Sequence, residues 1–406
     1  MKGATAAETD SAILDLIRSG GVVSRINLAN SSGLTGASIS RIVKRLLADG
    51  LIVETGVGDP TGGKPRTLLQ LNGHSRHAVG ISLDVEVNIF VITDLCGDVV
   101  VRQESAGIGN ESPSQAIQRV SGELNQMLSS EGIERSSLLG IGIAAAGRQD
   151  AHHHVLRANP PATEWELFAL EDTLSATTGL PVVVENDSTC AAIGEFWIGR
   201  IPATADFAAL YMANGFGLGL VTRGDVYRGS SSNVGEIGHM VVDVDGPDCW
   251  CGSRGCLETL AAPKRIVEQA LEQVTLAEEL GLRGQPADMR AEAGLIFRAA
   301  SEGHPDCVAL IEQSAGYLSK ALLSTTNLLD LDQIILAGPG FSEAGSIYLR
   351  VISEELERLS FVRAVHPTKV TLSRAGMDSA SLGAASLVLH SRLTPHQTTS
   401  RLALAR

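Results

Sequence analysis

Four side chains that commonly bind metal ions crowd into one short stretch of the chain, and this stretch constrains the fold more than any other local feature. They are His239, Cys249, Cys251 and Cys256, in the spacing His-x9-Cys-x-Cys-x4-Cys. Thiolates and imidazole are ligands that zinc prefers, and four of them close a tetrahedral site with no open position. The spacing therefore predicts a structural Zn2+ site over residues 239–256. The alternative is a loop of free thiols.

The remaining cysteines, Cys96, Cys190 and Cys307, are scattered and are expected to be ordinary buried thiols. A tight cluster in a reducing compartment indicates metal binding before a disulfide. The N-terminus lacks the apolar segment of a secretory signal, and no apolar run is long enough to span a bilayer. We therefore expect a cytoplasmic protein without membrane insertion.

Length and charge indicate two parts of different character. A chain of 406 residues favours two or three structural units, and 44% hydrophobic with 19% charged residues excludes global disorder. Residues 1–66 carry 8 Lys or Arg and 6 Asp or Glu, a net of +2, whereas the remainder carries 24 and 40, a net of -16. A slightly basic module thus precedes an acidic body, and local basic charge is what a phosphate backbone attracts.

The basic module has the pattern of three short helices. Asp10 is expected to cap the first, Ser24 the second, and Thr35 a third that runs to about Asp49. Apolar residues at helical spacing form one stripe on the third helix, namely Ile39, Ile42, Val43, Leu46 and Leu47. Two short helices joined by a glycine-containing turn form a helix-turn-helix.

Segments 51–55 and 67–71 are expected to pair as a hairpin, which would be the wing of a winged helix-turn-helix domain over residues 1–72. In such domains the second helix of the motif enters the major groove, and basic wing residues can reach a minor groove. The expected DNA contacts are Ser24, Arg25, Ala37, Ser38, Ser40, Arg41, Lys44, Arg45, Lys64 and Arg66. The alternative is a small helical domain that binds protein.

From residue 73 onward strands and helices alternate. Strands are expected at residues 79–83, 88–93, 99–102, 139–144, 181–185 and 333–337, with a strand pair over 207–222 and helices over 114–129 and 164–178. This alternation indicates an α/β fold for residues 73–406.

Two stretches of the body resemble the ROK family of repressors, open reading frames and sugar kinases. Residues 235–258 contain GEIGH followed by CWCGSRGCLE, and residues 180–187 read LPVVVEND. With the N-terminal winged helix, the chain is similar to the xylose, N-acetylglucosamine and glucose regulators of that family. The resemblance implies a two-lobed sugar-kinase fold of the actin-like, ribonuclease H-like type.

The resemblance also implies a sugar site between the lobes. Its expected residues are Gly147, Asn159, Asn186, Asp187, Glu236, His239 and Glu258. Asp187 matches the general base of the family's kinases and is expected here to be a vestigial base that binds sugar. His239 would bind the metal ion through one ring nitrogen and the sugar through the other, so that the metal fixes its tautomer. The alternative for Glu258 is a solvated surface acid.

The nucleotide half departs from the family. The resemblance implies an Asp-x-Gly-x-Thr phosphate loop, but the matching positions are Ser82, Asp84 and Glu86. Two like charges about 4 Å apart cost on the order of 4 kcal/mol near a protein surface, so these carboxylates should repel a phosphate. Asn214 replaces the usual Thr of a second phosphate loop, and Pro339 interrupts the adenosine loop. Phosphoryl transfer depends on positioning and charge stabilisation, so we expect no kinase activity.

These observations favour a sugar-responsive transcriptional regulator of carbohydrate metabolism genes, with a repressor preferred and an activator left as the alternative. A sugar bound between the lobes would change their closure, and thereby the spacing of paired winged helices on two-fold operator DNA. The expected partners are double-stranded DNA, a sugar effector and further copies of the chain, as a homodimer or homotetramer. The rival is an ATP-dependent ROK sugar kinase with an appended DNA-binding domain. A third hypothesis, a protein-interaction module, leaves the sugar residues unexplained.

Overall fold

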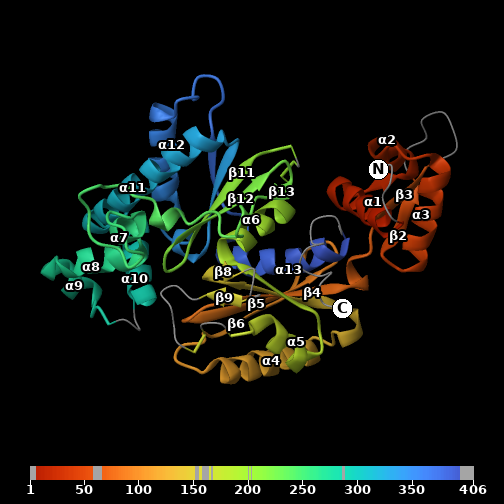
Figure 1. Ribbon diagram of the computed structural model, residues 1–406, viewed down its shortest axis with the longest axis horizontal. Helices are drawn as coiled ribbons and strands as arrows, with labels where there is room; N and C mark the ends of the chain where they lie inside the picture. The colour runs from red at the N-terminus through yellow and green to blue at the C-terminus, as the bar shows by residue number, and fades with distance from the viewer. Residues whose placement is uncertain are drawn as a thin grey trace.

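A winged helix-turn-helix lies beside a larger body of two lobes, each built around a mixed sheet (Figure 1). The computed structural model describes residues 6–57, 66–150, 155–157, 164–165, 168–199, 201–202, 204–285 and 289–393. We call the lobe with strands β4 to β7 and β10 the N lobe, and the lobe with strands β11 to β15 the C lobe.

Capping residues set the start of two winged-helix elements. The three helices are α1 (Ala6–Gly20), α2 (Arg25–Ser32) and α3 (Gly36–Ala48). Ser24 caps α2 and Thr35 caps α3, because each side-chain oxygen accepts a hydrogen bond from a backbone N–H of the first turn. Both predicted caps are confirmed. Gly33 ends α2 in the left-handed conformation, with φ of 69°.

The first helix begins before the residue that was expected to cap it. Helix α1 already includes Ala6, so Asp10 lies within the helix. The Asp10 carboxylate accepts a hydrogen bond from Arg45 Nε at 3.0 Å, which ties α1 to α3. The prediction of an N-cap at Asp10 is therefore wrong, because a tertiary ion pair provides the partner of this carboxylate.

The wing forms as a hairpin against α1 and α2. Strands β2 (Ile52–Val57) and β3 (Thr67–Leu71) pair in antiparallel fashion, and β1 (Val23–Ser24) joins the other edge of β3. This confirms the predicted wing, whose tip at 58–65 lies outside the described residues. The predicted stripe of α3 is buried except at Leu47, which is half-buried.

The two lobes repeat one sheet topology. In the N lobe the strands are β4 (His77–Leu83), β5 (Val87–Asp94), β6 (Val99–Ala106), β7 (Leu138–Ala145) and β10 (Val182–Asn186). In the C lobe they are β11 (Phe207–Met212), β12 (Phe216–Thr222), β13 (Asp225–Val226), β14 (Gln333–Ala337) and β15 (Lys369–Leu372). Counted within each lobe, both sheets have the order 3-2-1-4-5. Strands 1 to 3 are antiparallel and strands 4 and 5 run parallel to strand 1, which confirms the two-lobed α/β fold.

Helices cover both faces of each sheet (Figure 1). The helices of the body are α4 (Pro113–Ser130), α5 (Leu170–Thr178), α6 (Asp187–Ile198), α7 (Leu257–Ala261), α8 (Pro263–Leu271), α9 (Val274–Leu280), α10 (Met289–Ser301), α11 (Pro305–Leu329), α12 (Gly345–Leu359) and α13 (Ser379–Leu393). A short hairpin of β8 (Arg148–Asp150) and β9 (Val155–Arg157) follows β7. Among the described residues, none of the helices combines the length and apolarity needed to cross a membrane.

The helix expected over residues 164–178 is shorter than predicted. Helix α5 begins at Leu170. Ahead of it, the rings of Trp165 and Phe168 meet edge to face with centroids 5.7 Å apart and pack on the N-lobe core. Tertiary packing of these aromatic rings thus takes the place of the predicted first helical turns.

Two helices fill the space between the sheets. Helix α13 packs on β4 and β7 of the N lobe, α6 packs on β11 and β12 of the C lobe, and the two helices pack on each other. Glycines permit this contact, because a Cβ on Gly383 would lie 1.6 Å from the carbonyl oxygen of Cys190, and one on Gly194 would lie 2.7 Å from that of Ser379. The lobes therefore meet through backbone that has no room for side chains.

We expect Gly383→Ala to destabilise the body by about 2 kcal/mol or more, because overpacking a close contact costs on the order of 1–3 kcal/mol. The measurement is the free energy of unfolding from urea denaturation. The control is Gly316→Ala in α11, where a Cβ would meet nothing within 4 Å. That change should stabilise the helix by roughly 0.5–1 kcal/mol. Equal stability of the two variants would contradict the close crossing of α6 and α13.

Candidate functional site

The end of β10 and the start of α6 bring two predicted sugar ligands together. Asn186 caps α6, because its Oδ1 accepts hydrogen bonds from the backbone N–H groups of Ser188 at 3.0 Å and Thr189 at 3.3 Å. Its Nδ2 donates to the carbonyl oxygen of Gly147 at 3.3 Å, which joins the ends of β7 and β10. Asp187 is thereby fixed as the first residue of α6.

The Asp187 carboxyl lies in an environment that resists ionisation. Burial raises the pKa of Asp187 to about 6, and the nearby carboxylates of Asp84 and Glu236 act in the same direction. A hydrogen bond from the Ser188 backbone N–H opposes this shift. Asp187 is half-buried, and its raised pKa is of the kind that desolvated carboxyls in functional sites often have.

Glu236 belongs to the same group of charges. It immediately precedes a short 3-10 turn, Ile237–His239. Burial raises the pKa of Glu236, Glu258 raises it further, and His239 and Arg148 lower it. Three predicted sugar ligands and one arginine that the sequence analysis did not select therefore interact at one place. Convergent carboxylates and cationic donors suit a polyol, which donates and accepts many hydrogen bonds.

Glu258 is held in place rather than free on the surface. Its Oε1 accepts a hydrogen bond from Trp250 Nε1 at 3.3 Å. A Cβ on Gly215 or Gly238 would lie 2.7 or 3.0 Å from its Oε2, so the carboxylate fills the space that these glycines leave. The Trp250 ring also meets the His239 imidazole edge to face, with centroids 5.0 Å apart. Trp250 therefore orients two predicted ligands, and its position between two cysteines is the signal that could have found it.

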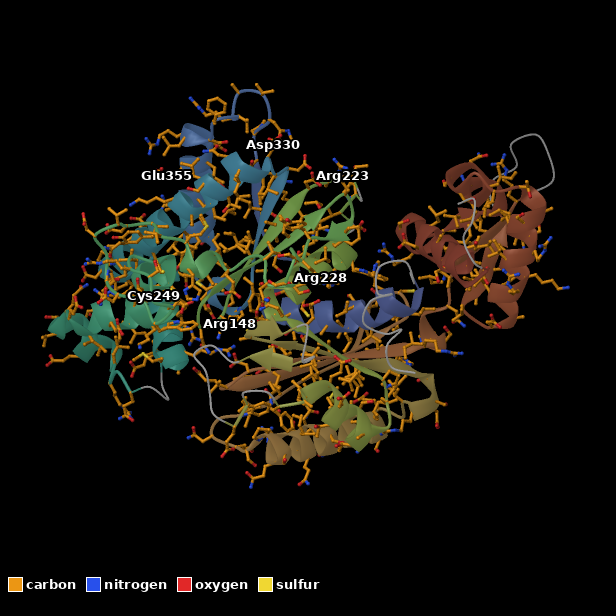
Figure 2. The ribbon with its side chains drawn as sticks, in the orientation of Figure 1. Arg148, Arg223, Arg228, Cys249, Asp330 and Glu355 are labelled. Atoms are coloured by element: carbon orange, nitrogen blue, oxygen red, sulfur yellow. The ribbon has the colours of Figure 1, made fainter. Side chains whose placement is uncertain are left out.

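The predicted metal ligands converge. One ligand atom from each of His239, Cys249, Cys251 and Cys256 lies within 4.8 Å of the others. Cys251 Sγ and Cys256 Sγ are 3.7 Å apart, and Cys249 Sγ is 3.6 Å from His239 Nδ1. Tetrahedral zinc with bonds of about 2.3 Å to sulfur and about 2.0 Å to nitrogen separates its ligand atoms by roughly 3.8 and 3.6 Å. The cluster can therefore hold a metal ion, and Cys249 lies on the side of the C lobe away from the winged helix (Figure 2).

The loop expected to face nucleotide phosphates makes its hydrogen bonds within the protein. The Asp84 carboxylate accepts a hydrogen bond from the Glu86 backbone N–H at 2.9 Å. It also pairs with Arg290 of α10 at 3.4 Å, across the gap between the lobes. The Asp84 backbone N–H donates to Asn88 Oδ1 at 3.0 Å. Arg290 thus partly neutralises the Asp84 charge that was expected to repel a phosphate. The backbone N–H groups of Asp84 and Glu86 donate to side chains of the same loop.

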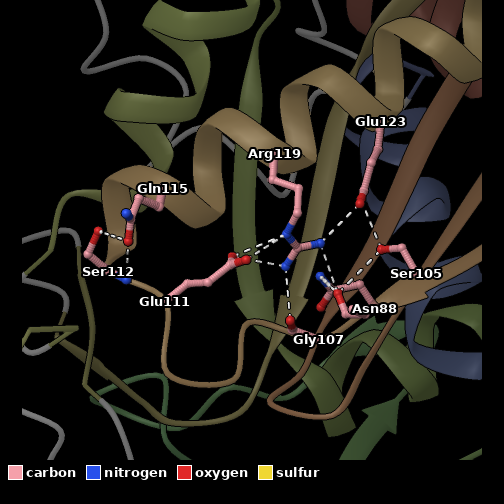
Figure 3. Close-up of polar contacts among 9 residues, drawn as sticks. Asn88, Ser105, Gly107, Glu111, Ser112, Gln115, Arg119 and Glu123 are labelled. Carbon is pink, nitrogen blue, oxygen red and sulfur yellow. Dashed lines mark hydrogen bonds and ion pairs between the residues drawn. The ribbon is translucent and has the colours of Figure 1, made fainter.

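A network centred on Arg119 of α4 braces this loop (Figure 3). The guanidinium donates to the carbonyl oxygens of Ala106 and Gly107 at 2.9 Å each, and it pairs with Glu111 and Glu123. The Gly107 backbone N–H in turn donates to the carbonyl oxygen of Glu86 at 2.8 Å. The segment around Asp84 therefore contacts the Arg119 network through Glu86 and pairs with Arg290 through Asp84.

Helix α3 presents exposed polar and basic groups. Ala37, Ser40, Arg41 and Lys44 are exposed, and Ser38 is half-buried beside the Thr35 cap. Within the described part of the chain, Arg41 and Lys44 have no ion-pair partner. They are thus the two predicted contacts on α3 with positive charge free for a phosphate backbone.

Three other predicted DNA contacts are already engaged. Ser24 is 3% exposed and its hydroxyl caps α2, so it is not available to a base. Arg25 pairs with Glu54 of the wing at 2.9 Å, and Arg45 pairs with Asp10. A phosphate would have to compete with these carboxylates. Arg66 is exposed, whereas Lys64 and the predicted sugar ligand Asn159 lie outside the described residues.

Comparison with known proteins separates the chain into the same two parts. The sequence profile of the ROK family matches residues 79–391, and the profile of winged helix-turn-helix DNA-binding domains matches residues 7–53. The xylose repressor of Caldicellulosiruptor bescii is 24% identical over 390 residues, which cover 94% of this chain and 95% of the repressor.

Two solved structures are similar to the fold. A ROK family transcriptional regulator, a homologue of the Escherichia coli MLC protein, is 25% identical with a TM-score of 0.75, covering 96% of this chain and 99% of that one. A ROK family glucokinase from Streptomyces griseus, in complex with glucose and AMPPNP, is 26% identical with a TM-score of 0.66 and covers 77% of this chain and 98% of its own. The similarity to the regulator therefore covers more of this chain.

We expect Asp187→Asn to stabilise the protein in a pH-dependent manner. The pKa of Asp187 is raised from 3.8 to about 6, so the folded state binds the proton more tightly than the unfolded chain. The carboxylate therefore destabilises the fold above the folded pKa, and the penalty is absent below the unfolded value. Asparagine removes a penalty of about 3 kcal/mol at pH 8 and roughly half of that at pH 5. Urea unfolding at both pH values measures the difference, and a gain that does not change with pH would contradict the assignment.

Proposed function

The chain belongs to the ROK family, and we propose that it is a sugar-responsive transcriptional repressor of carbohydrate metabolism genes. One observation carries the proposal. A winged helix with exposed basic side chains on α3 is attached to a body in which the predicted sugar-binding acids converge. In the same body, the loop expected to face nucleotide phosphates donates its Glu86 backbone N–H to Asp84. Similarity to a repressor over 94% of this chain supports the same function.

We propose that the sugar binds where the two lobes face each other. Its ligands would be the residues implied by the family resemblance: Gly147, Asn159, Asn186, Asp187, Glu236, His239 and Glu258. The charge coupling of Asp187 and Glu236 supports a shared ligand for these carboxyls. A carboxylate is the form that accepts hydroxyl hydrogen bonds, so sugar affinity should increase as the pH rises through about 6.

The metal site would hold structural Zn2+. His239, Cys249, Cys251 and Cys256 would supply all four ligands, which leaves no open position for catalysis. Because His239 also faces Glu236, a bound ion would fix the orientation of a residue at the sugar site. Zinc would thus contribute to the shape of the site and to the stability of the C lobe.

The rival function, ATP-dependent sugar kinase, is less well supported by the nucleotide half. A phosphate loop has to offer backbone N–H groups and net positive potential to a phosphate. Here the Glu86 N–H donates to Asp84, and Asp84 also engages Arg290. With its phosphate contacts made internally, the protein is proposed to lack kinase activity, and Asp187 would serve as a sugar ligand.

DNA binding would fall to residues 1–72, and sugar and metal binding to residues 73–406. Arg41 and Lys44 of α3 would contact phosphates or base edges, with Lys64 and Arg66 at the wing. A regulator of this kind works in the cytoplasm on double-stranded operator DNA. We propose a homodimer or homotetramer, since paired winged helices match a two-fold operator.

We expect the purified protein to hold about one zinc ion per chain, because a closed four-ligand site binds zinc tightly. Cys251→Ser should lose most of this zinc and lower the melting temperature. The control is Cys96→Ser, outside the cluster; Cys96 is exposed, so the expectation of a buried thiol is wrong for it and is confirmed for Cys190 and Cys307. Elemental analysis by mass spectrometry gives the metal content. A wild-type protein without zinc, or a Cys251→Ser variant with full zinc content, would contradict the assignment.

We expect the protein to capture a few discrete fragments from sheared genomic DNA and to release them with one sugar of a panel. Glu236→Ala and Asp187→Ala should abolish release while leaving capture intact, because neither residue belongs to the winged helix. Glu355→Ala, on the surface of α12, serves as the control and should behave as the wild type.

Release of DNA by sugar from either site variant would overturn the sugar site. Failure of the wild-type protein to capture any fragment would remove the main support for the regulator. ATP consumption with a sugar of the same panel would then establish the kinase.

A further inference from the structure

Helix α6 connects the proposed sugar site to the winged helix. Its first residue is Asp187 and its last turn contains Trp197. A helix of 12 residues is roughly 18 Å long at about 1.5 Å per residue. Trp197 is 7% exposed and contacts the winged helix directly. The two ends of one rigid element therefore lie at the two sites whose coupling the proposed function requires.

The contact at Trp197 is well defined. The Arg18 guanidinium of α1 lies over the indole ring, 4.1 Å from its centroid. Arg18 is held there by Asp15, since its Nε donates to Asp15 Oδ1 at 3.0 Å. On another side, the His390 ring of α13 meets the indole edge to face at 5.9 Å. A cation above an aromatic face is attractive and depends on orientation, so the contact is sensitive to small displacements.

The winged helix is attached to both lobes. Helix α1 packs on α13, which itself packs on the N-lobe sheet. Trp197 belongs to a turn that is fixed to the C lobe, because Ser373 after β15 donates a hydrogen bond to Glu195, and Phe196 stacks on Phe207 of β11. The contact of α1 with α13 would therefore move with the N lobe, and the contact of Arg18 with Trp197 would move with the C lobe.

The crossing of α6 and α13 lies between these ends. Gly383 of α13 contacts α6 at Cys190 and Gly194, which stand between Asp187 and Trp197 along the helix. A small rotation at the crossing would move the two ends of α6 in opposite directions. A displacement at Asp187 would therefore shift Trp197 relative to α13. It would also shift Trp197 relative to α1, which contacts both Trp197 and α13.

We propose that the Trp197–Arg18 contact transmits sugar binding to the DNA-binding domain. Closure of the lobes around a sugar would move Trp197 relative to α13, and Arg18 would carry this movement to α1 and so to α3. The inference rests on the proposed function and names the residues through which its two sites are coupled. Coupling between sites in proteins commonly amounts to about 5–150-fold in affinity, which is the effect expected to be lost here.

The test uses the full-length protein with a captured genomic fragment as DNA and with D-xylose, D-glucose and N-acetyl-D-glucosamine as sugar probes. The coupling factor is the ratio of fragment Kd values with and without sugar, measured by fluorescence anisotropy. Trp197→Leu keeps an apolar side chain and removes the aromatic face, whereas Arg18→Gln removes the cation and leaves the tryptophan in place. The control is Lys320→Gln, which removes a cation from Tyr317 at 4.8 Å within the C-lobe helix α11.

We expect both variants to bind the fragment without sugar, and the sugar by calorimetry, within about twofold of the wild type, while the coupling factor falls to nearly 1. The control should keep the wild-type factor. A full coupling factor in folded Arg18→Gln would overturn the inference even if Trp197→Leu did not fold. If the wild-type protein binds the fragment but none of the probes changes its affinity, the proposed sugar response itself has failed, and the inference fails with it.

Discussion

Close contact between the backbones of α6 and α13 is the constraint on which the rest of the body depends. Each helix packs on the sheet of one lobe, so the distance between the two helix axes sets the distance between the sheets. Gly194 and Gly383 fix this distance, because neither position has space for a Cβ. Close-packed interiors transmit displacement instead of absorbing it. The relative placement of the two sheets therefore follows from which residues lack side chains at this crossing.

The proposed sugar site and the candidate metal cluster share His239 and are therefore considered together. His239 belongs to the cluster and interacts with Glu236, and Trp250 stands between two cysteines and bonds to Glu258. The sharp turns of the cysteine loop thus bring an aromatic N–H to an acid that lies several residues further along the chain. A change in the cysteine loop would therefore also change the position of Glu258 and Glu236 in the proposed sugar site.

Much of the fold could be predicted from local sequence. Ser24 and Thr35 are strong N-capping residues followed by helical periodicity, and both caps are confirmed. The spacing of the cysteines also identified a cluster that converges in space. Asp10 has the same capping chemistry as Ser24, yet it pairs with Arg45 from α3. Local propensity does not reveal a partner that tertiary structure brings from 35 positions away.

In the candidate site, too, residues in local motifs could be predicted, whereas partners that folding brings from elsewhere in the chain could not. The acids at Asp187 and Glu236 were found because they stand in recognisable motifs. Arg290 and Arg148 stand in none, and only folding places them beside Asp84 and Glu236. For the DNA contacts, sequence pattern identified the face of α3 but did not separate the free cations from those that pair with acids of the wing and of α1.

The internal hydrogen bonds of Asp84 have a consequence for the conditions under which the proposed regulator responds. In a kinase, cleft closure depends on two small molecules, and the nucleotide varies with the energy supply of the cell. In the proposed regulator the donors that a nucleotide phosphate would use, the Glu86 backbone N–H and the Arg290 guanidinium, are engaged by Asp84, which is present at one copy per chain. Occupancy of the proposed sugar site would then depend on sugar concentration alone, in a starved cell and in a growing one alike.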